Sequence, residues 1–192
     1  MCGTDWIEAL NEKNYKKYGR CILAPSLDLV ERVFADYDSE EEAKVVRSLV
    51  EEIRSKQYYI PALELIMVDD TDSVVGYAMF SRFQLEGKFD EELLILTPVA
   101  VKTELQRRHI SKDLIEAGFE KAKEMGFKAV LVEGNPQNYN ARGFVTSADY
   151  GIVAGPDIHL PDINCLMIKE LEEHALEHIK GVVDYSFYSM LR

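Results

Sequence analysis

A small surplus of cations stands out in an otherwise acidic chain of 192 residues, whose formal net charge is −12. Between residues 102 and 112, one acid, Glu104, is outnumbered by four cations: Lys102, Arg107, Arg108 and Lys112. The segment lies between an apolar run and an amphipathic run, and free backbone N–H groups at such a strand-to-helix turn favour an anion. The charges indicate a site for a phosphate-bearing ligand, and a solvated turn with surface cations is the alternative.

The elements around this loop form one recognisable unit. Leu93–Val101 is a nearly unbroken apolar run, which is typical of a strand buried on both faces. From Ile110 the spacing becomes helical, and Gly126 suits the C-terminus of that helix. Ala129–Val132 is a second short strand, and such a strand–helix–strand crossover joins parallel strands. The expected buried row of the helix is Ile110, Leu114, Gly118, Ala122 and Met125, with Ile115 and Phe119 beside it.

Pro98 interrupts the first of these strands. Proline cannot donate to a sheet ladder, so it marks an edge, a bulge or a break in pairing. If pairing fails there, the N–H groups of Val99 and Val101 become available to a ligand, because a buried amide needs a partner. Plain edge-strand status is the alternative interpretation.

The order of these elements, followed by Tyr139-x-x-x-Gly143-Phe144, resembles the acetyl-CoA-binding core of the GCN5-related N-acetyltransferase (GNAT) superfamily. The segment Gly134–Tyr139 (G-N-P-Q-N-Y) is similar to a bacterial subgroup of predicted N-acetyltransferases with a G-[DN]-P-x-x-Y pattern. The resemblance extends from about Ser39 to Tyr185. It implies one α/β (α+β) domain over residues 1–192, with a mixed, mostly antiparallel sheet that has a splayed parallel central strand pair and is flanked by helices.

The resemblance also implies an activity, the transfer of an acetyl group from acetyl-CoA to a primary amine. Acetyl-CoA would be a cosubstrate, with no metal involved. Residues of the first strand would hold its pantetheine arm and the basic loop its pyrophosphate. The implied cofactor-binding residues are Val99, Ala100, Val101, Arg107, Arg108, His109, Ile110, Ser111, Lys112 and Asn135.

The basic loop departs from the pattern of the family. The family's loop usually reads Q/R-x-x-G-x-G/A, whereas this chain has Gln106-Arg107-Arg108-His109-Ile110-Ser111, so His109 and Ser111 fill both glycine places. Glycines let a backbone approach a phosphate closely. The alternative function is therefore a non-catalytic ligand- or protein-binding module with a degenerate loop. A generic nucleotide-binding domain is a weaker hypothesis, because no Gly-rich phosphate-binding motif follows a predicted strand.

Tyr139 is the predicted catalytic residue. In the family, a tyrosine at this place is the general acid that protonates the departing thiolate, and a phenol is a proton donor at neutral pH. A tyrosine that only packs its ring under the sheet is the alternative. No general base is assigned from the sequence. Six residues could take a proton through water, although each is more often a solvated surface group: Glu91, Glu92, Glu133, Asp157, His159 and Asp162.

The composition limits which binding partners and which cellular compartment we expect for this protein. Net charge −12 argues against nucleic acid and anionic membranes and suits a cationic substrate, here a small-molecule or peptide amine. Three scattered cysteines read as reduced thiols of a cytoplasmic protein, and neither a membrane span nor a signal peptide is recognised. His174 and His178 lack a third metal ligand, and Cys165 reads as a buried structural thiol. A homodimer is compatible with the sequence.

The remaining elements are predicted from local patterns. Residues 1–20 are expected to form an arm or a short helix, with Trp6, Ile7 and Leu10 at helical spacing. Ser39 with Glu42 predicts a helix N-cap, and Val45, Leu49 and Ile53 its buried row. The other expected elements are a strand at Cys21–Ala24, a helix at Ser26–Ala35, a hairpin of Leu63–Val68 with Val74–Phe83, a long loop at Ser147–Pro161, and closing strands at Asn164–Ile168 and Val182–Tyr185.

Overall fold

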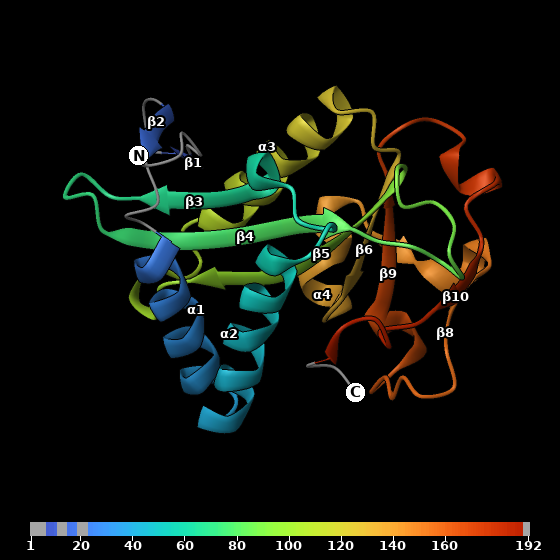
Figure 1. The fold of residues 1–192 in the computed structure, drawn as a ribbon, viewed down its shortest axis with the longest axis horizontal. Helices are drawn as coiled ribbons and strands as arrows, with labels where there is room; N and C mark the ends of the chain where they lie inside the picture. Colours follow the sequence, from blue (N-terminus) through green and yellow to red (C-terminus); the bar gives the residue numbers. More distant parts are fainter. Residues whose placement is uncertain (1–6, 11–14, 19–22, 190–192) are drawn as a thin grey trace. The chain divides into compact units, whose positions relative to one another are not determined.

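A computed structural model describes residues 7–10, 15–18 and 23–189 of the chain (Figure 1). The chain divides into two compact units, residues 1–80 with 97–121 and residues 81–96 with 122–192. Strands β4 (Val74–Arg82) and β5 (Leu93–Val101) each pass from one unit into the other. No helix among the described residues is long and apolar enough to cross a membrane.

Two helices of the first unit, α1 (Leu23–Tyr37) and α2 (Glu40–Ser55), lie side by side in Figure 1. Ser39 is the N-cap of α2, as predicted, because its hydroxyl oxygen accepts a hydrogen bond from the Glu42 N–H at 3.1 Å. In the predicted buried row of α2, Leu49 and Ile53 are buried and Val45 is half-buried. The full set of buried α2 residues is Ala43, Val46, Leu49, Val50 and Ile53.

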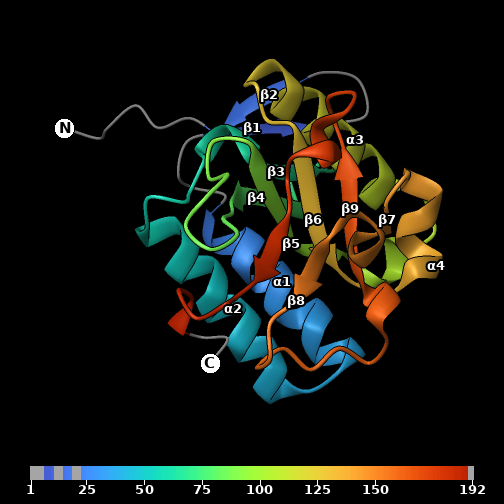
Figure 2. The ribbon, with the colours of Figure 1, turned by 90° about the vertical axis from the view of Figure 1, so that its right-hand side faces the viewer.

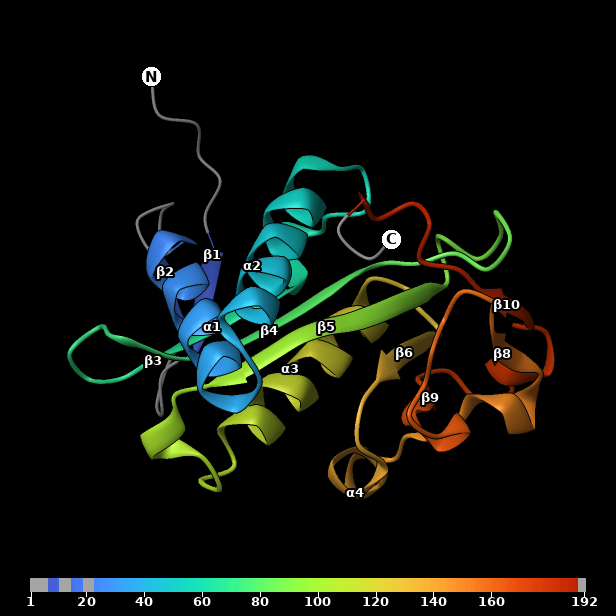
Figure 3. The same cartoon turned by 90° about the horizontal axis from the view of Figure 1, so that it is seen from below.

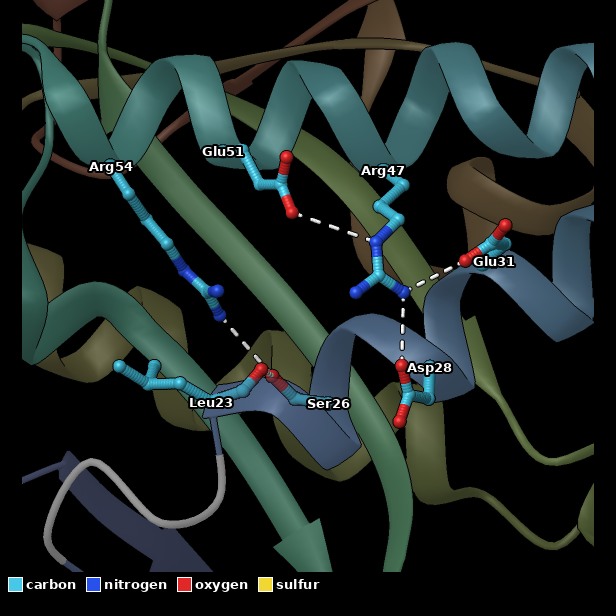
Figure 4. Close-up of polar contacts among 7 residues, drawn as sticks. All are labelled: Leu23, Ser26, Asp28, Glu31, Arg47, Glu51 and Arg54. Carbon is cyan, nitrogen blue, oxygen red and sulfur yellow. Dashed lines mark hydrogen bonds and ion pairs between the residues drawn. The ribbon is translucent and has the colours of Figure 1, made fainter.

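Arg47 ties α2 to α1 (Figure 4). Its Nη1 atom lies 2.9 Å from the Asp28 carboxylate and 2.8 Å from that of Glu31, and its Nε atom lies 3.5 Å from Glu51. One guanidinium therefore forms ion pairs with carboxylates of both helices. Two turns further along α2, the Arg54 guanidinium donates to the Ser26 hydroxyl of α1 at 3.2 Å. These bonds fix how the two helices pack within the first unit.

A buried carboxylate anchors this helix pair to the first strands. Glu64, the first residue of β3 (Glu64–Val68), is 1% exposed. Its oxygens accept hydrogen bonds from Arg54, from the Tyr59 hydroxyl at 2.5 Å and from the Tyr77 hydroxyl at 2.7 Å. A buried charge is tolerated only when it is paired and hydrogen-bonded in this way. Burial and the neighbouring Glu64 charge raise the pKa of Tyr77 well above its ordinary value, so Tyr77 remains a donor.

The strands of the first unit run in the order β2-β1-β3-β4. Strands β1 (Ile7–Leu10) and β2 (Tyr15–Tyr18) are antiparallel, and β1 pairs in parallel with β3. The β3–β4 pair is antiparallel, which confirms the predicted hairpin. The predicted short helix around Ile7 and Leu10 is wrong, since both residues lie in a strand, and Trp6 falls outside the described residues. Pairing with a neighbouring strand outweighs local spacing in so short a segment.

Helix α3 (Ile110–Glu124) packs closely on β4 because glycines remove side chains at the contact. A Cβ on Gly118 would lie 2.1 Å from the Phe80 ring, and one on Gly76 would lie 2.6 Å from Ile110. Phe80 also meets Phe119 edge to face, with ring centroids 6.0 Å apart. The predicted helix is confirmed, but Met125 is 46% exposed because it follows the last residue of α3.

The second unit is built on a parallel strand pair. The first residues of β5 pair in parallel with β6 (Ala129–Glu133), as predicted for the crossover. On its other side, β6 pairs antiparallel with β9 (Leu166–Glu170), which pairs antiparallel with β7 (Val145–Thr146), giving the order β5-β6-β9-β7 (Figure 2). A separate parallel pair joins β8 (Ile152–Ala154) to β10 (Gly181–Val183). The predicted mixed, mostly antiparallel sheet is confirmed.

Two local predictions fail for identifiable reasons. The strand expected at Cys21–Ala24 is wrong at Leu23 and Ala24, which open α1, with Pro25 in its first turn, where proline is tolerated; Cys21 and Ile22 lie outside the described residues. The long loop expected at Ser147–Pro161 contains a short helical turn, Ser147–Tyr150, and strand β8. Strand β8 is only three residues long, so its apolar pattern is too short to read.

Candidate active site

The parallel pairing of β5 with β6 covers only the first part of β5. It joins Leu93–Ile95 to Ala129–Leu131 and stops before the Thr97–Pro98 peptide, which is cis. From Thr97 to Val101, half-buried and buried side chains alternate, as in a regular strand. The predicted break at Pro98 thus coincides with the end of the parallel ladder.

Strand β5 also contains one residue more than the stretch of β4 opposite to it. The Lys102 N–H donates to the Val75 carbonyl at 3.0 Å, and the Phe83 N–H donates to the Leu93 carbonyl at 2.9 Å. Eight positions separate Val75 from Phe83, whereas nine separate Leu93 from Lys102, so β5 holds a net β-bulge between these bonds. Bulges re-aim backbone groups and are common beside active sites.

The register fixes the direction of the candidate amides. Because the Lys102 N–H points to β4 and successive strand N–H groups alternate, those of Val99 and Val101 point away from β4. They therefore face the side on which the parallel ladder has ended. This orientation is the one that a hydrogen-bonding ligand alongside β5 requires.

The basic loop adopts a glycine-like backbone without glycine. Arg107 and His109 have φ angles of 63° and 66°, the left-handed region that residues other than glycine seldom enter. His109 fills the first of the two places where the resembling family has glycine, and histidine is among the side chains enriched in this region. Ser111, at the second place, lies inside α3, where no positive φ is needed. At the first glycine place the loop therefore has a backbone conformation that glycine favours.

The loop presents positive charge at the N-terminus of α3. The first helical hydrogen bond joins the Asp113 N–H to the His109 carbonyl at 3.0 Å, so α3 begins directly at this loop. Arg107, Arg108 and His109 are exposed, and Lys112 lies 3.7 Å from Glu116, one turn further on. Helix dipole and side-chain charge together favour an anion here.

In the second unit, Tyr139 ends the short helix α4 (Pro136–Tyr139) and its ring is held on three sides. A Cβ on Gly134 would lie 2.4 Å from Tyr139 Cε2, so the ring rests directly on that glycine. The Phe144 ring meets it edge to face at 5.4 Å, and the Arg142 guanidinium lies 5.9 Å from the ring centroid. Burial raises the pKa of Tyr139 above its ordinary value, against the opposing charge of Arg142. The phenol is therefore protonated at neutral pH.

Asn135 serves the same short helix. Its side-chain oxygen accepts a hydrogen bond from the Gln137 N–H at 2.9 Å, which makes it the N-cap of α4. This role positions Tyr139, and a contact of Asn135 with a cofactor stays a prediction. The strand Val99–Val101 and the loop Arg107–Lys112 lie in the first unit, and Asn135 and Tyr139 lie in the second.

The candidate bases differ in how their side chains are engaged. Glu92 lies 2.9 Å from Lys128 and 3.0 Å from His178, and these bonds lower the pKa of Glu92. Glu91 pairs with Arg82 at 2.6 Å. Asp162 accepts a hydrogen bond from the Asn164 N–H at 2.8 Å, and Asp157 and His159 are exposed loop residues.

Glu133 accepts a hydrogen bond from Tyr185, a residue that the sequence did not identify as part of the site. The Tyr185 hydroxyl donates to Glu133 Oε2 at 3.1 Å. The two residues are 52 positions apart, so only the folded chain brings them together.

The remaining sequence candidates have ordinary partners. His174 Nδ1 lies 2.9 Å from Glu177 Oε1, and His178 Nε2 lies 3.0 Å from Glu92 Oε2. The two histidines therefore contact different carboxylates. Cys165 is half-buried and has a free thiol. Among the described residues, no group of three or more histidine, cysteine, aspartate or glutamate side chains has an arrangement that holds a metal ion.

Comparison with known proteins decides the family. The model of the Acetyltransferase (GNAT) family matches residues 28–150, which is more than half of the chain. The chain belongs to this family. Two curated relatives from Escherichia coli agree. Over 170 residues, it is 26% identical to the uncharacterized N-acetyltransferase YhbS, covering 84% of this chain and 90% of the relative. Over 133 residues, it is 33% identical to the uncharacterized N-acetyltransferase YjhQ, covering 68% and 71%.

Solved structures show that the GNAT chain has the fold of its family. The YhbS structure from Escherichia coli, in complex with CoA, matches with a TM-score of 0.74 and 24% identity, over 86% of this chain and 84% of that one. A GNAT family acetyltransferase from Brucella melitensis, in complex with acetyl-CoA, matches with a TM-score of 0.57 and 24% identity, over 67% and 80%. At these identities the likeness establishes the fold.

Proposed function

We propose that this GNAT protein transfers the acetyl group of acetyl-CoA to a primary amine of a small molecule or peptide. The observation that carries the proposal is the backbone of the basic loop. His109, at the place where the family usually has glycine, takes the left-handed conformation that glycine favours, immediately before the N-terminus of α3. The loop thus has a glycine-like backbone at His109 although both glycines are replaced. That two structural relatives are described in complex with CoA and acetyl-CoA supports the same cosubstrate here.

Each part of the cosubstrate has a proposed partner. The N–H groups of Val99 and Val101, with Ala100 between them, would hydrogen-bond the amide-bearing pantetheine arm along β5. The pyrophosphate would take the first-turn amides of α3 and the side chains of the loop, because both favour an anion. These loop residues are Arg107, Arg108, His109, Ile110, Ser111 and Lys112. Asn135 would contact the cosubstrate from the start of α4.

Transfer would proceed by direct attack. The amine nitrogen adds to the thioester carbonyl carbon, and the backbone N–H near Val99 stabilises the oxyanion. The C–S bond then breaks, and Tyr139 gives its phenolic proton to the departing sulfur. The raised pKa of Tyr139 keeps the phenol protonated at neutral pH, which is the state that a proton donor needs.

Calorimetric titration with acetyl-CoA tests the cosubstrate. Micromolar affinity, about −8 kcal/mol, is expected for the native chain. The double variant Arg107→Glu/Arg108→Glu should abolish binding, because it reverses both exposed charges of the loop. Arg32→Glu/Lys44→Glu is the matched control, since it makes the same charge change at two exposed positions on α1 and α2. Equal losses in the two double variants would remove the loop from the proposal, and no binding by the native chain would favour a non-catalytic module.

A further inference from the structure

The end of β6 directs two neighbouring residues to opposite faces. The antiparallel ladder with β9 pairs Glu133 with Leu166 and continues one step further, where the Gly134 N–H donates to the Cys165 carbonyl at 2.8 Å. Successive residues of such a strand point to opposite faces. The Tyr139 ring covers the Gly134 face, so the Glu133 side chain projects from the other. Figure 3 shows α4 and the C-terminal segment, in red, on opposite sides of β6.

The C-terminal segment supplies a partner on the Glu133 face. The Tyr185 hydroxyl donates to Glu133 Oε2 at 3.1 Å, and the Tyr185 ring meets Phe83 edge to face with centroids 6.0 Å apart. Burial, and after it the charge of Glu133, raise the pKa of Tyr185, so its hydroxyl keeps its proton and remains a donor. Glu133 itself is exposed. A carboxylate has about four acceptor positions. One hydrogen bond from Tyr185 therefore orients the Glu133 carboxylate and leaves its other acceptor positions available.

We propose that Glu133 is the general base for the amine acceptor and that Tyr185 is its positioning residue. The assignment rests on the acetyl transfer proposed above. In direct attack, the nucleophile and the leaving sulfur need proton transfer in opposite directions, one group accepting and the other donating. The end of β6 places an oriented carboxylate on one face and a protonated phenol, Tyr139, on the other. Of the carboxylates near the strand ends, Glu91 and Glu92 are already paired with cations.

Protons and bonds balance across the step. An acceptor that arrives as an ammonium first loses one proton to solvent. As the amine nitrogen forms its bond to the carbonyl carbon, Glu133 takes a second proton from that nitrogen. The C–S bond breaks with its electron pair on sulfur, which takes the Tyr139 proton. A proton then passes from Glu133 to the Tyr139 phenolate through solvent, and both residues return to their starting states.

The pH dependence of turnover separates this role from a structural one. The Tyr185 phenol faces Glu133 through this hydrogen bond, and the Tyr188 phenol interacts electrostatically with Tyr185. We expect Glu133→Gln to lower kcat about 100-fold at neutral pH and to abolish the rise of kcat on the acidic side. The glutamine oxygen still accepts the Tyr185 bond, so the fold and the affinity for acetyl-CoA should be unchanged. Glu172→Gln, at an exposed position, is the matched control.

Tyr185→Phe gives a second, independent readout. It removes the hydrogen bond that orients the carboxylate, so we expect kcat to fall about tenfold in the native background and to be unchanged in the Glu133→Gln background. A merely structural tyrosine would lower kcat by the same factor in both backgrounds.

The outcomes distinguish the base from the reaction itself. An active Glu133→Gln variant with kcat within about twofold of the native value and an unchanged acidic limb would overturn the base while leaving acetyl transfer intact. A native chain that binds acetyl-CoA but acetylates no member of a panel of primary amines and lysine peptides would refute the proposed function. In that case no amine needs a base, and the assignment of Glu133 would be overturned with it.

Discussion

Replacing His109 by glycine should stabilise the protein, although substitutions to glycine usually destabilise. His109 has a φ angle of 66°, and the left-handed region costs an L-residue roughly 1–2 kcal/mol. Glycine avoids that cost but loses roughly 0.5–1 kcal/mol more conformational entropy on folding. The midpoints of these two ranges differ by about 0.75 kcal/mol, a net gain that for a chain of this size raises Tm by about 1.5–3 °C. Glycine is also a better N-cap than histidine, and His109 immediately precedes α3.

Arg108→Gly is the matched control for this effect. Arg108 is the adjacent, equally exposed residue, and its φ angle is not positive. Glycine there has only the entropic cost, so we expect a loss of about 0.5–1 kcal/mol. Thermal and urea unfolding of the two variants should therefore shift in opposite directions. Equal destabilisation by both would refute the left-handed backbone at His109, and with it the observation on which the cosubstrate proposal depends.

Three further perturbations test the core, the acid and an ion pair. Gly118→Ala should destabilise the protein by about 1–3 kcal/mol in urea unfolding, because its Cβ would lie 2.1 Å from the buried Phe80 ring. Tyr139→Phe should lower kcat while calorimetry finds acetyl-CoA affinity unchanged, and an unchanged kcat would remove Tyr139 from the mechanism. Bonding to Lys128 lowers the pKa of Glu92, so its contribution to stability is present at neutral pH and is lost as the pH falls below about 4.5. Glu92→Gln should flatten that loss in acid unfolding, and an unaltered acid transition would count against the pairing.

The elements with strong periodicity were predictable from the sequence. Leu93–Val101 has the same bounds in the structure as in its apolar run, and α3 begins at Ile110, where the spacing becomes helical. A long run of one period leaves few alternatives. Short segments were not predictable. Ile7–Leu10 is a strand because β2 and β3 pair with it, and a pairing partner is not a property of four residues.

The candidate site divides in the same way. The N-cap at Ser39 and the break in strand pairing at Pro98 depend on local residue types, so the sequence could predict both. The bulge in β5 depends on the register between two strands, which no single strand encodes. The Glu133–Tyr185 bond joins residues 52 positions apart, so neither side chain signals the other.

The basic loop shows why a motif departure is weaker evidence than it looks. A glycine in a phosphate loop can serve two purposes, a left-handed φ angle or room for the ligand. At Ser111 the backbone is helical, so only the room is at stake, and a serine hydroxyl adds a hydrogen-bonding group in exchange. At His109 the φ angle is retained by a side chain that tolerates it and can add charge. Losing glycine therefore changes the energy of this loop more than its shape, and the unfolding experiment on His109 measures that energy directly.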